Sequence, residues 1–153
     1  MAVLTTLLVA LLVATGLLVA HDLEVGQRPE QRQAALEQAR KVALQIIGIN
    51  GGNASEKIEA LLAETTGPYR ERLTTDSGAL ATALRDGQIS STAAIAAAGL
   101  ETFDDDTASA LVVLNGTLVN ADAPQGQPVS YRLALQLRRE GDRWLVSTVE
   151  VIP

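Results

Sequence analysis

Few residues of this chain have side chains suited to catalysis or metal binding, and they lie far apart. Cysteine is absent and the single histidine is His21. Thiol catalysis, disulfides and Cys-ligated zinc are therefore excluded, and the commonest general base is missing after residue 21. The run Asp104-Asp105-Asp106 offers oxygen ligands to calcium, but the full acidic loop with its distal glutamate is absent. We interpret this run as a solvated turn and predict no metal site and no cofactor.

Three aromatic side chains are candidates for lining a ligand pocket. The chain has four aromatic residues, and Tyr69, Tyr131 and Trp144 are the ones expected on inward faces of the fold. Trp144 either stacks on a ligand or packs a sheet against helices, which buries about 200 Å². We interpret it as a core residue. The two tyrosines are interpreted as packed rings whose hydroxyl groups are exposed to solvent, with pocket lining as the alternative.

A second candidate site is a group of arginines near the C-terminus. Arg132, Arg138 and Arg139 are predicted to form a small basic strip on the outer face of a strand. Such a strip either contacts an acidic partner or is solvated, because exposed charges usually stay in water. We expect the solvated state and keep partner contact as the alternative.

Length and charge restrict the class of protein. The chain has 153 residues, enough for one domain. Lysine and arginine total 12 against 18 acidic residues, giving a net charge of −6. Nucleic acid is therefore an unlikely target for this chain, since phosphate binding requires a basic surface. The sequons that begin at Asn53 and Asn115 are interpreted as structural, the first as a helix cap and the second within a strand.

The first 20 residues contain no charged side chain and are mostly apolar. Twenty helical residues span about 30 Å, the thickness of a bilayer's hydrocarbon core. We predict a transmembrane anchor at residues 1–20, inserted in the lipid bilayer, and a juxtamembrane linker at 21–29. A cleaved signal peptide is the main rival, because Ala14-Thr15-Gly16 offers small residues, and a buried soluble helix is a weaker one. Leu17 and Leu18 continue the apolar run, which favours the anchor.

Residues 30–153 are predicted to form one α+β domain. Apolar residues recur at helical spacing from Glu30 to about Ile47, and two further helices begin at Asn53 and at Gly67-Pro68. After Gly87 the apolar period changes to two, which indicates four strands near 88–103, 108–120, 129–139 and 143–152. Three helices followed by an antiparallel meander predict helices packed on a curved four-stranded sheet. This is the cone-shaped type called nuclear-transport-factor-2-like.

Several short motifs along this pattern resemble one family. They are Ala39-Arg40, Thr66-Gly67-Pro68-Tyr69, Ala98-Gly99-Leu100-Glu101, Ala108–Val113, Tyr131-Arg132-Leu133 and Gly141–Val146. Together with the N-terminal span, they resemble the Mce-associated membrane proteins, accessory proteins of mammalian-cell-entry lipid importers. The resemblance implies a single-pass protein of the bacterial cell membrane with an extracytoplasmic C-terminal domain. Its implied role is to stabilise the protein subunits of a lipid transporter.

Two other functions stay open beside this one. A scaffold subunit of a secretion or conjugation channel would use a similarly anchored cone. A small-molecule-binding or catalytic domain would use the cone interior, where an isomerase or dehydratase places a carboxylate or histidine. Because the predicted inward positions are almost all aliphatic, we expect a non-enzymatic domain.

Overall fold

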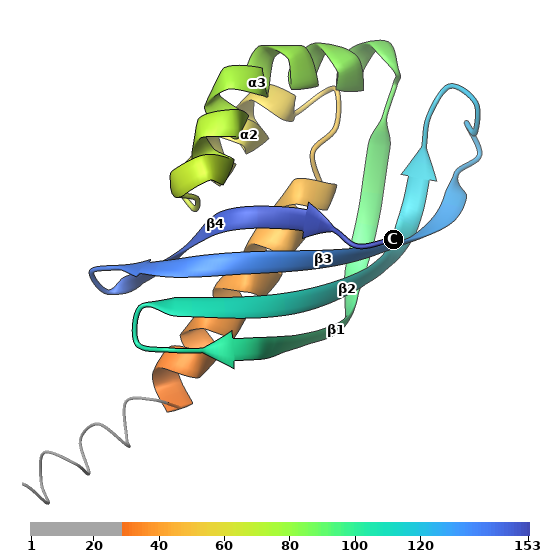
Figure 1. Cartoon of the computed structure of the whole chain (residues 1–153). Helices are drawn as coiled ribbons and strands as arrows, with labels where there is room; N and C mark the ends of the chain where they lie inside the picture. The colour runs from red at the N-terminus through yellow and green to blue at the C-terminus, as the bar shows by residue number, and fades with distance from the viewer. Residues whose placement is uncertain (1–28) are drawn as a thin grey trace, which may run out of the picture. The chain divides into compact units, whose positions relative to one another are not determined.

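The structure is a computed structural model that describes residues 29–153. Within that range a first helix, helical over 29–47, precedes two helices and four strands (Figure 1). Their bounds are α2 Ala54–Leu62, α3 Gly67–Asp86, β1 Ser90–Phe103, β2 Thr107–Val119, β3 Gln127–Glu140 and β4 Arg143–Val151. Residues Ala34–Pro153 form one compact unit. This confirms the predicted order of three helices followed by four strands.

The predicted anchor at residues 1–20 and most of the linker at 21–29 lie outside the described residues. Pro29, assigned to the end of that linker, is already helical. Over residues 29–153, no helix combines the length and the apolar character needed to cross a membrane.

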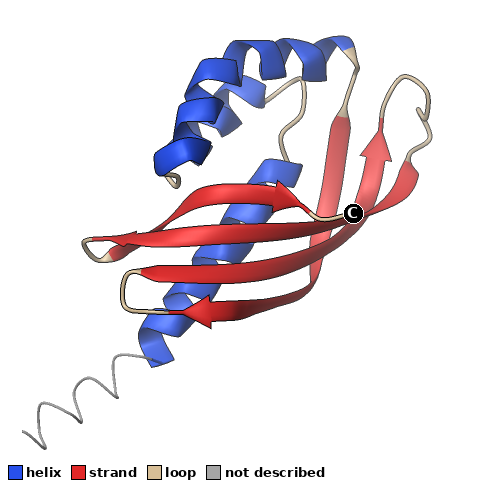
Figure 2. Ribbon diagram, in the orientation of Figure 1, coloured by secondary structure: helices blue, strands red, loops and turns tan. Residues whose placement is uncertain are grey.

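The first helix buries the apolar stripe that the sequence predicts. Ala35, Ala39, Val42 and Ala43 have no exposed surface. Their spacing of three and four residues places them on one face of the helix. The small alanines allow the helix backbone to lie close to the sheet, so the core forms between this helix and the strands (Figure 2).

The loop after the first helix differs from the prediction in one detail. Asn53 occupies the N-cap position of α2 but makes no capping hydrogen bond from its side chain. Its Oδ1 instead accepts from the backbone N–H of Asn50 at 2.9 Å, and Asn50 Oδ1 accepts from Gly52 N at 3.0 Å. The predicted helix cap at Asn53 is therefore wrong, because the two asparagine side chains stabilise the loop itself.

Helix α3 continues through a segment with poor helix propensity. The threonines, serine and glycine of the Thr74–Gly78 stretch have low helix propensity, yet the helix is continuous from Gly67 to Asp86. Thr74 Oγ1 donates to Arg70 O at 2.8 Å, and Thr75 Oγ1 donates to Glu71 O at 3.0 Å. These hydroxyls bond back to the preceding turn, so they are satisfied within the helix.

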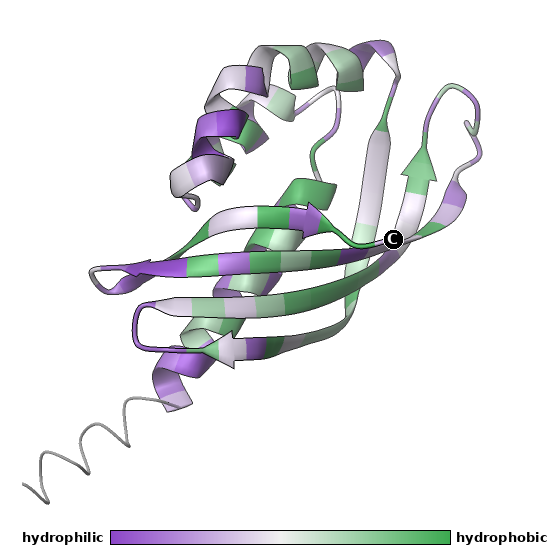
Figure 3. Ribbon diagram, viewed as in Figure 1, coloured by the Kyte–Doolittle hydropathy of each residue, from purple (hydrophilic) through white to green (hydrophobic). Residues whose placement is uncertain are grey.

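The four strands form one antiparallel sheet in the order β1-β2-β3-β4. In β3 the side chains alternate as predicted, with Leu133, Leu135 and Leu137 buried and the even-numbered arginines exposed. Figure 3 shows this alternation as apolar and polar bands along the strand. Gly141, at φ +62°, makes the tight turn into β4.

The two edges of the sheet differ. The backbone of β4 forms hydrogen bonds with the segment before α3. Thr66 N donates to Val146 O at 2.9 Å, and Val146 N donates to Glu64 O at 3.1 Å. This segment ties α2 and α3 to the sheet. The other edge is β1, whose register with β2 shifts twice, between Ile95 and Ala97 and between Leu100 and Thr102. Such bulges increase the local bend of a strand.

Candidate functional site

Trp144 lies inside the hydrophobic core. Its exposed fraction is 4%, and its ring centroid is 5.6 Å from that of Phe103 at an interplanar angle of 44°. The pair joins the end of β1 to the start of β4, and a tilted arrangement of this kind is favourable for aromatic rings. The expectation that Trp144 packs the core is confirmed.

The two tyrosines lie at the border of the core on different elements. Tyr69 is in the first turn of α3 and Tyr131 is in β3, and both are partly buried against the core. Burial raises the pKa of the Tyr69 phenol, and the charge of Arg72 opposes part of that effect. Neither tyrosine lines the cavities described below, and pocket lining by these rings stays a prediction.

The three arginines do not share one face. Arg132 and Arg138 are exposed on the outer face of β3, whereas Arg139 is half-buried and has the parity of the core-facing leucines. Arg132 Nη1 donates to the carbonyl oxygen of Pro153 at 2.8 Å. Arg139 lies 3.9 Å from Asp142, in the turn to β4. The predicted strip therefore reduces to Arg132 and Arg138, six residues apart on the same strand.

A charged cluster joins three elements around Glu64, which follows α2. Glu64 accepts from Lys41 Nζ at 2.7 Å and from Gln38 Nε2 at 2.8 Å, both on the first helix. Arg143 Nη2, at the start of β4, approaches it at 3.5 Å and donates to Ala63 O at 3.1 Å. Burial acts to raise the pKa of Glu64, but these hydrogen bonds and positive charges outweigh it and hold the pKa below its usual range.

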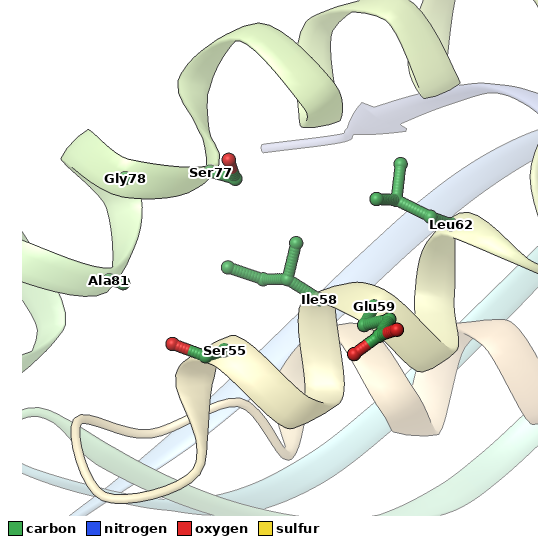
Figure 4. A pocket seen from close by; sticks show the side chains of 7 residues that line it. All are labelled: Ser55, Ile58, Glu59, Leu62, Ser77, Gly78 and Ala81. Atoms are coloured by element: carbon green, nitrogen blue, oxygen red, sulfur yellow. The ribbon is translucent and has the colours of Figure 1, made fainter.

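A groove between α2 and α3 is the candidate binding site that sequence reasoning missed. It has a volume of about 270 Å³. Ile58 and Leu62 extend from α2 toward α3 across it (Figure 4). We call it the α2/α3 groove and define it by Ser55, Ile58, Glu59, Leu62, Ser77, Gly78 and Ala81. The available signal is Gly78, a glycine inside a predicted helix.

Two further hollows lie beside a loop and on the outer face of the sheet. One of about 480 Å³ lies against the loop of Asn50, Gly51 and Gly52 and the end of α3. The other, of about 280 Å³, is lined by hydroxyl side chains and Arg138 on the outer face of the sheet. No group of three or more His, Cys, Asp or Glu side chains suited to a metal ion occurs among the described residues.

Two solved structures share this architecture. An IcmL-like type IV secretion system protein from Legionella pneumophila has a TM-score of 0.62 at 12% identity, covering 80% of this chain and 92% of that one. The periplasmic domain of DotI has a TM-score of 0.60 at 14% identity, covering 79% and 94%. At such low identity the likeness establishes the fold alone, that of helices packed on a four-stranded antiparallel sheet.

Sequence comparison places the chain in a family. Over 139 residues it is 19% identical to "Uncharacterized protein Rv1363c" of Mycobacterium tuberculosis, a match that covers 91% of this chain and 53% of that protein. The chain thus spans about half the length of that curated relative. A family model described as "Uncharacterized protein Rv1363c/MT1408-like" matches residues 1–153. Because this match covers the whole chain, the chain belongs to the Rv1363c/MT1408-like family.

Proposed function

We propose that this protein is a membrane-anchored, non-enzymatic scaffold subunit that helps to assemble or stabilise a multi-subunit complex of the bacterial cell envelope. The observation that carries the proposal is the filled interior of the cone. The sheet face toward the helices is occupied by packed aliphatic side chains, among them Leu114, Leu133, Leu135 and Leu137, each at most 1% exposed. A cone-fold enzyme uses this space for its substrate. The outer surfaces are then the parts of the domain available for its function.

A secretion-type channel is the first candidate for this complex. The domain shares its fold with an IcmL-like type IV secretion system protein and with the periplasmic domain of DotI. The similar domain of DotI is periplasmic, which supports an extracytoplasmic position for residues 30–153. Fold alone does not confer function, so the complex must be identified by isolating it.

An Mce-type lipid importer is the second candidate. It rests on the motif resemblance, in which Tyr131-Arg132-Leu133 and Gly141–Val146 now lie on neighbouring strands β3 and β4. In this case the protein stabilises the transporter subunits and transports no lipid itself.

Co-purification separates the two candidates. The tagged full chain is isolated from crosslinked native membranes, and its associated proteins are identified by mass spectrometry. Enrichment of secretion-channel subunits supports the first candidate, and enrichment of Mce transporter subunits supports the second. Recovery of the protein without any stoichiometric subunit contradicts the scaffold function itself.

The extracytoplasmic position needs a separate test. Alkaline phosphatase, which folds to its active form only after export, is fused after Pro153. We expect the fusion to be active, because the motif resemblance implies an extracytoplasmic C-terminal domain and the similar domain of DotI is periplasmic. An inactive but stably produced fusion would place the domain in the cytoplasm.

A further inference from the structure

The α2/α3 groove has an apolar floor formed by residues at the border of the core. Ile58 and Ala81 are 3% and 8% exposed, and Leu62 beside them is partly buried against the core. They form a continuous aliphatic wall between two helices. A methylene chain lying on such a wall loses contact with water, which stabilises the contact through the hydrophobic effect.

Gly78 keeps this groove open. It lies in the interior of α3, where a glycine is unfavourable relative to alanine. A Cβ atom at this position would meet no other atom within 4 Å, and the φ angle of Gly78 is not positive. Neither packing nor backbone conformation within the described chain requires a glycine here. Its effect is to leave free the space that a side chain would fill.

The groove also has a negative charge with no partner. Glu59 lines it and forms no ion pair or side-chain hydrogen bond with the described residues. The hydroxyls of Ser55 and Ser77 lie on the two helices beside it. Ser77 Oγ donates to Thr74 O at 3.1 Å, which leaves its lone pairs free to accept. The groove thus combines an aliphatic wall with oxygen acceptors and one carboxylate.

We propose that the α2/α3 groove binds a lysine or arginine side chain of a partner protein. The aliphatic stem of that side chain lies on Ile58 and Leu62, and its charged head donates to the carboxylate of Glu59. Long basic side chains bind in this way because stem and head prefer different surroundings. The net charge of −6 favours approach of a basic partner. This inference rests on the proposed function, since it identifies the surface by which the scaffold contacts another subunit.

A lysine side-chain analogue tests the groove without a partner protein. The full chain, labelled with ¹⁵N in a nanodisc, is titrated with n-butylammonium and, separately, with n-butanoate, which has a stem of similar length and the opposite charge. We expect saturable amide shifts confined to residues 55–62 and 77–81 with n-butylammonium and none with n-butanoate. Equal responses to the two ions, or shifts distributed over the whole domain, would overturn the proposal.

Matched variants test whether binding depends on the charge of Glu59 and on the open space at Gly78. Glu59→Gln removes the charge and should weaken n-butylammonium binding roughly three-fold, the effect of one exposed ion pair. Gly78→Leu fills the groove and should abolish the shifts. The controls are Glu150→Gln, an exposed acid on β4, and Ala79→Leu, an exposed residue of α3 outside the groove. Either control behaving like its groove counterpart would contradict the assignment.

Co-purification of the same variants separates this inference from the proposed function. If the groove is the contact, Gly78→Leu should lose the associated subunits and Glu59→Gln should recover a smaller amount of them, while both controls keep them. If Gly78→Leu retains the complete complex, the groove proposal fails and the scaffold function stands. If the wild-type groove binds n-butylammonium but no complex is recovered, the proposed function fails.

Discussion

Individual side chains connect elements that are far apart in the sequence. Trp144 contacts the ring of Phe103 across the sheet, and Glu64 bonds the first helix to the segment before α3 and to β4. The first contact is apolar and the second is charged. The two therefore respond to different perturbations.

Replacing Trp144 by alanine should greatly destabilise the domain. A 4% exposed indole is lost together with its contact to Phe103, which costs about 3–5 kcal/mol. Urea unfolding followed by circular dichroism measures the change, because the chain has no other tryptophan to report by fluorescence. Trp144→Phe, which keeps a ring, should lose less. A fully stable Trp144→Ala variant would show that the indole is not a core anchor.

Glu64 should make folding stability depend on acid pH. Its pKa in the folded state lies below the ordinary glutamate value of 4.5, so the ionised form is favoured in the folded state. Its contribution is complete above about pH 4.5 and is lost as the pH falls through the folded pKa. Glu64→Gln removes this contribution.

Urea titrations at pH 7, 4.5 and 3 test this dependence. The stability gap between wild type and Glu64→Gln should be largest at pH 7 and should narrow toward pH 3. Glu150→Gln, on an exposed position of β4, should leave the pH profile unchanged. A gap of constant size at all three pH values would contradict the role of the carboxylate charge.

At the scale of elements, α3 shows how tertiary contacts override local propensity. The helix contains two threonines, a serine and a glycine in succession around Asp76, yet it spans 20 residues. Leu73 and Ala81 are buried on one of its faces, and Tyr69, Leu80 and Leu84 pack partly against the core. Burial of this face stabilises the helix despite its weak centre.

Gly78→Ala should stabilise the domain. The added Cβ meets no atom within 4 Å, and alanine is better than glycine in a helix interior by about 0.5–1 kcal/mol. Gly51→Ala is the matched control, because a Cβ there would lie 2.8 Å from Arg85 Cα and should destabilise the domain. Thermal melting of both variants and the wild type shows whether each substitution stabilises or destabilises the domain. A destabilised Gly78→Ala variant would show that the glycine is needed for folding.

For the whole molecule, the decisive feature is the filled space between the first helix and the sheet. Apolar residues from the helices and all four strands meet in one core. The domain therefore offers its outer surfaces for contact, among them the α2/α3 groove with the unpaired carboxylate of Glu59. We propose that residues 1–20 hold this scaffold at the membrane.

The full chain should stay in the membrane fraction after a carbonate wash. The reason is the uncharged run of residues 1–20, which is long enough to span a bilayer as a helix. Immunoblotting of the pellet, with mass spectrometry of the recovered protein, tests retention and N-terminal sequence together. A mature chain that begins near Leu17 or His21 would indicate a cleaved signal peptide.

The sequence alone determined the fold class, the order of the elements and the buried face of β3. These features follow from apolar spacing, which is a local property: period 3.6 for the helices and period 2 for the strands. Trp144 could be assigned to the core for the same reason. The alternation of β3 also places Arg139 on the side of the buried leucines, so the prediction of Arg139 on the outer face was wrong.

Only the tertiary structure decided which side chains meet across elements. The bonds of Glu64 to Lys41 and Arg143 depend on how the helices approach each other and the sheet. The same holds for the hydrogen bond that Asn53 Oδ1 accepts from Asn50 N within the loop. The α2/α3 groove likewise exists because Gly78 of one helix faces Ile58 of another. Their separation of 20 residues in the chain leaves no periodic signal, since such pairs are set by packing geometry and not by local propensity.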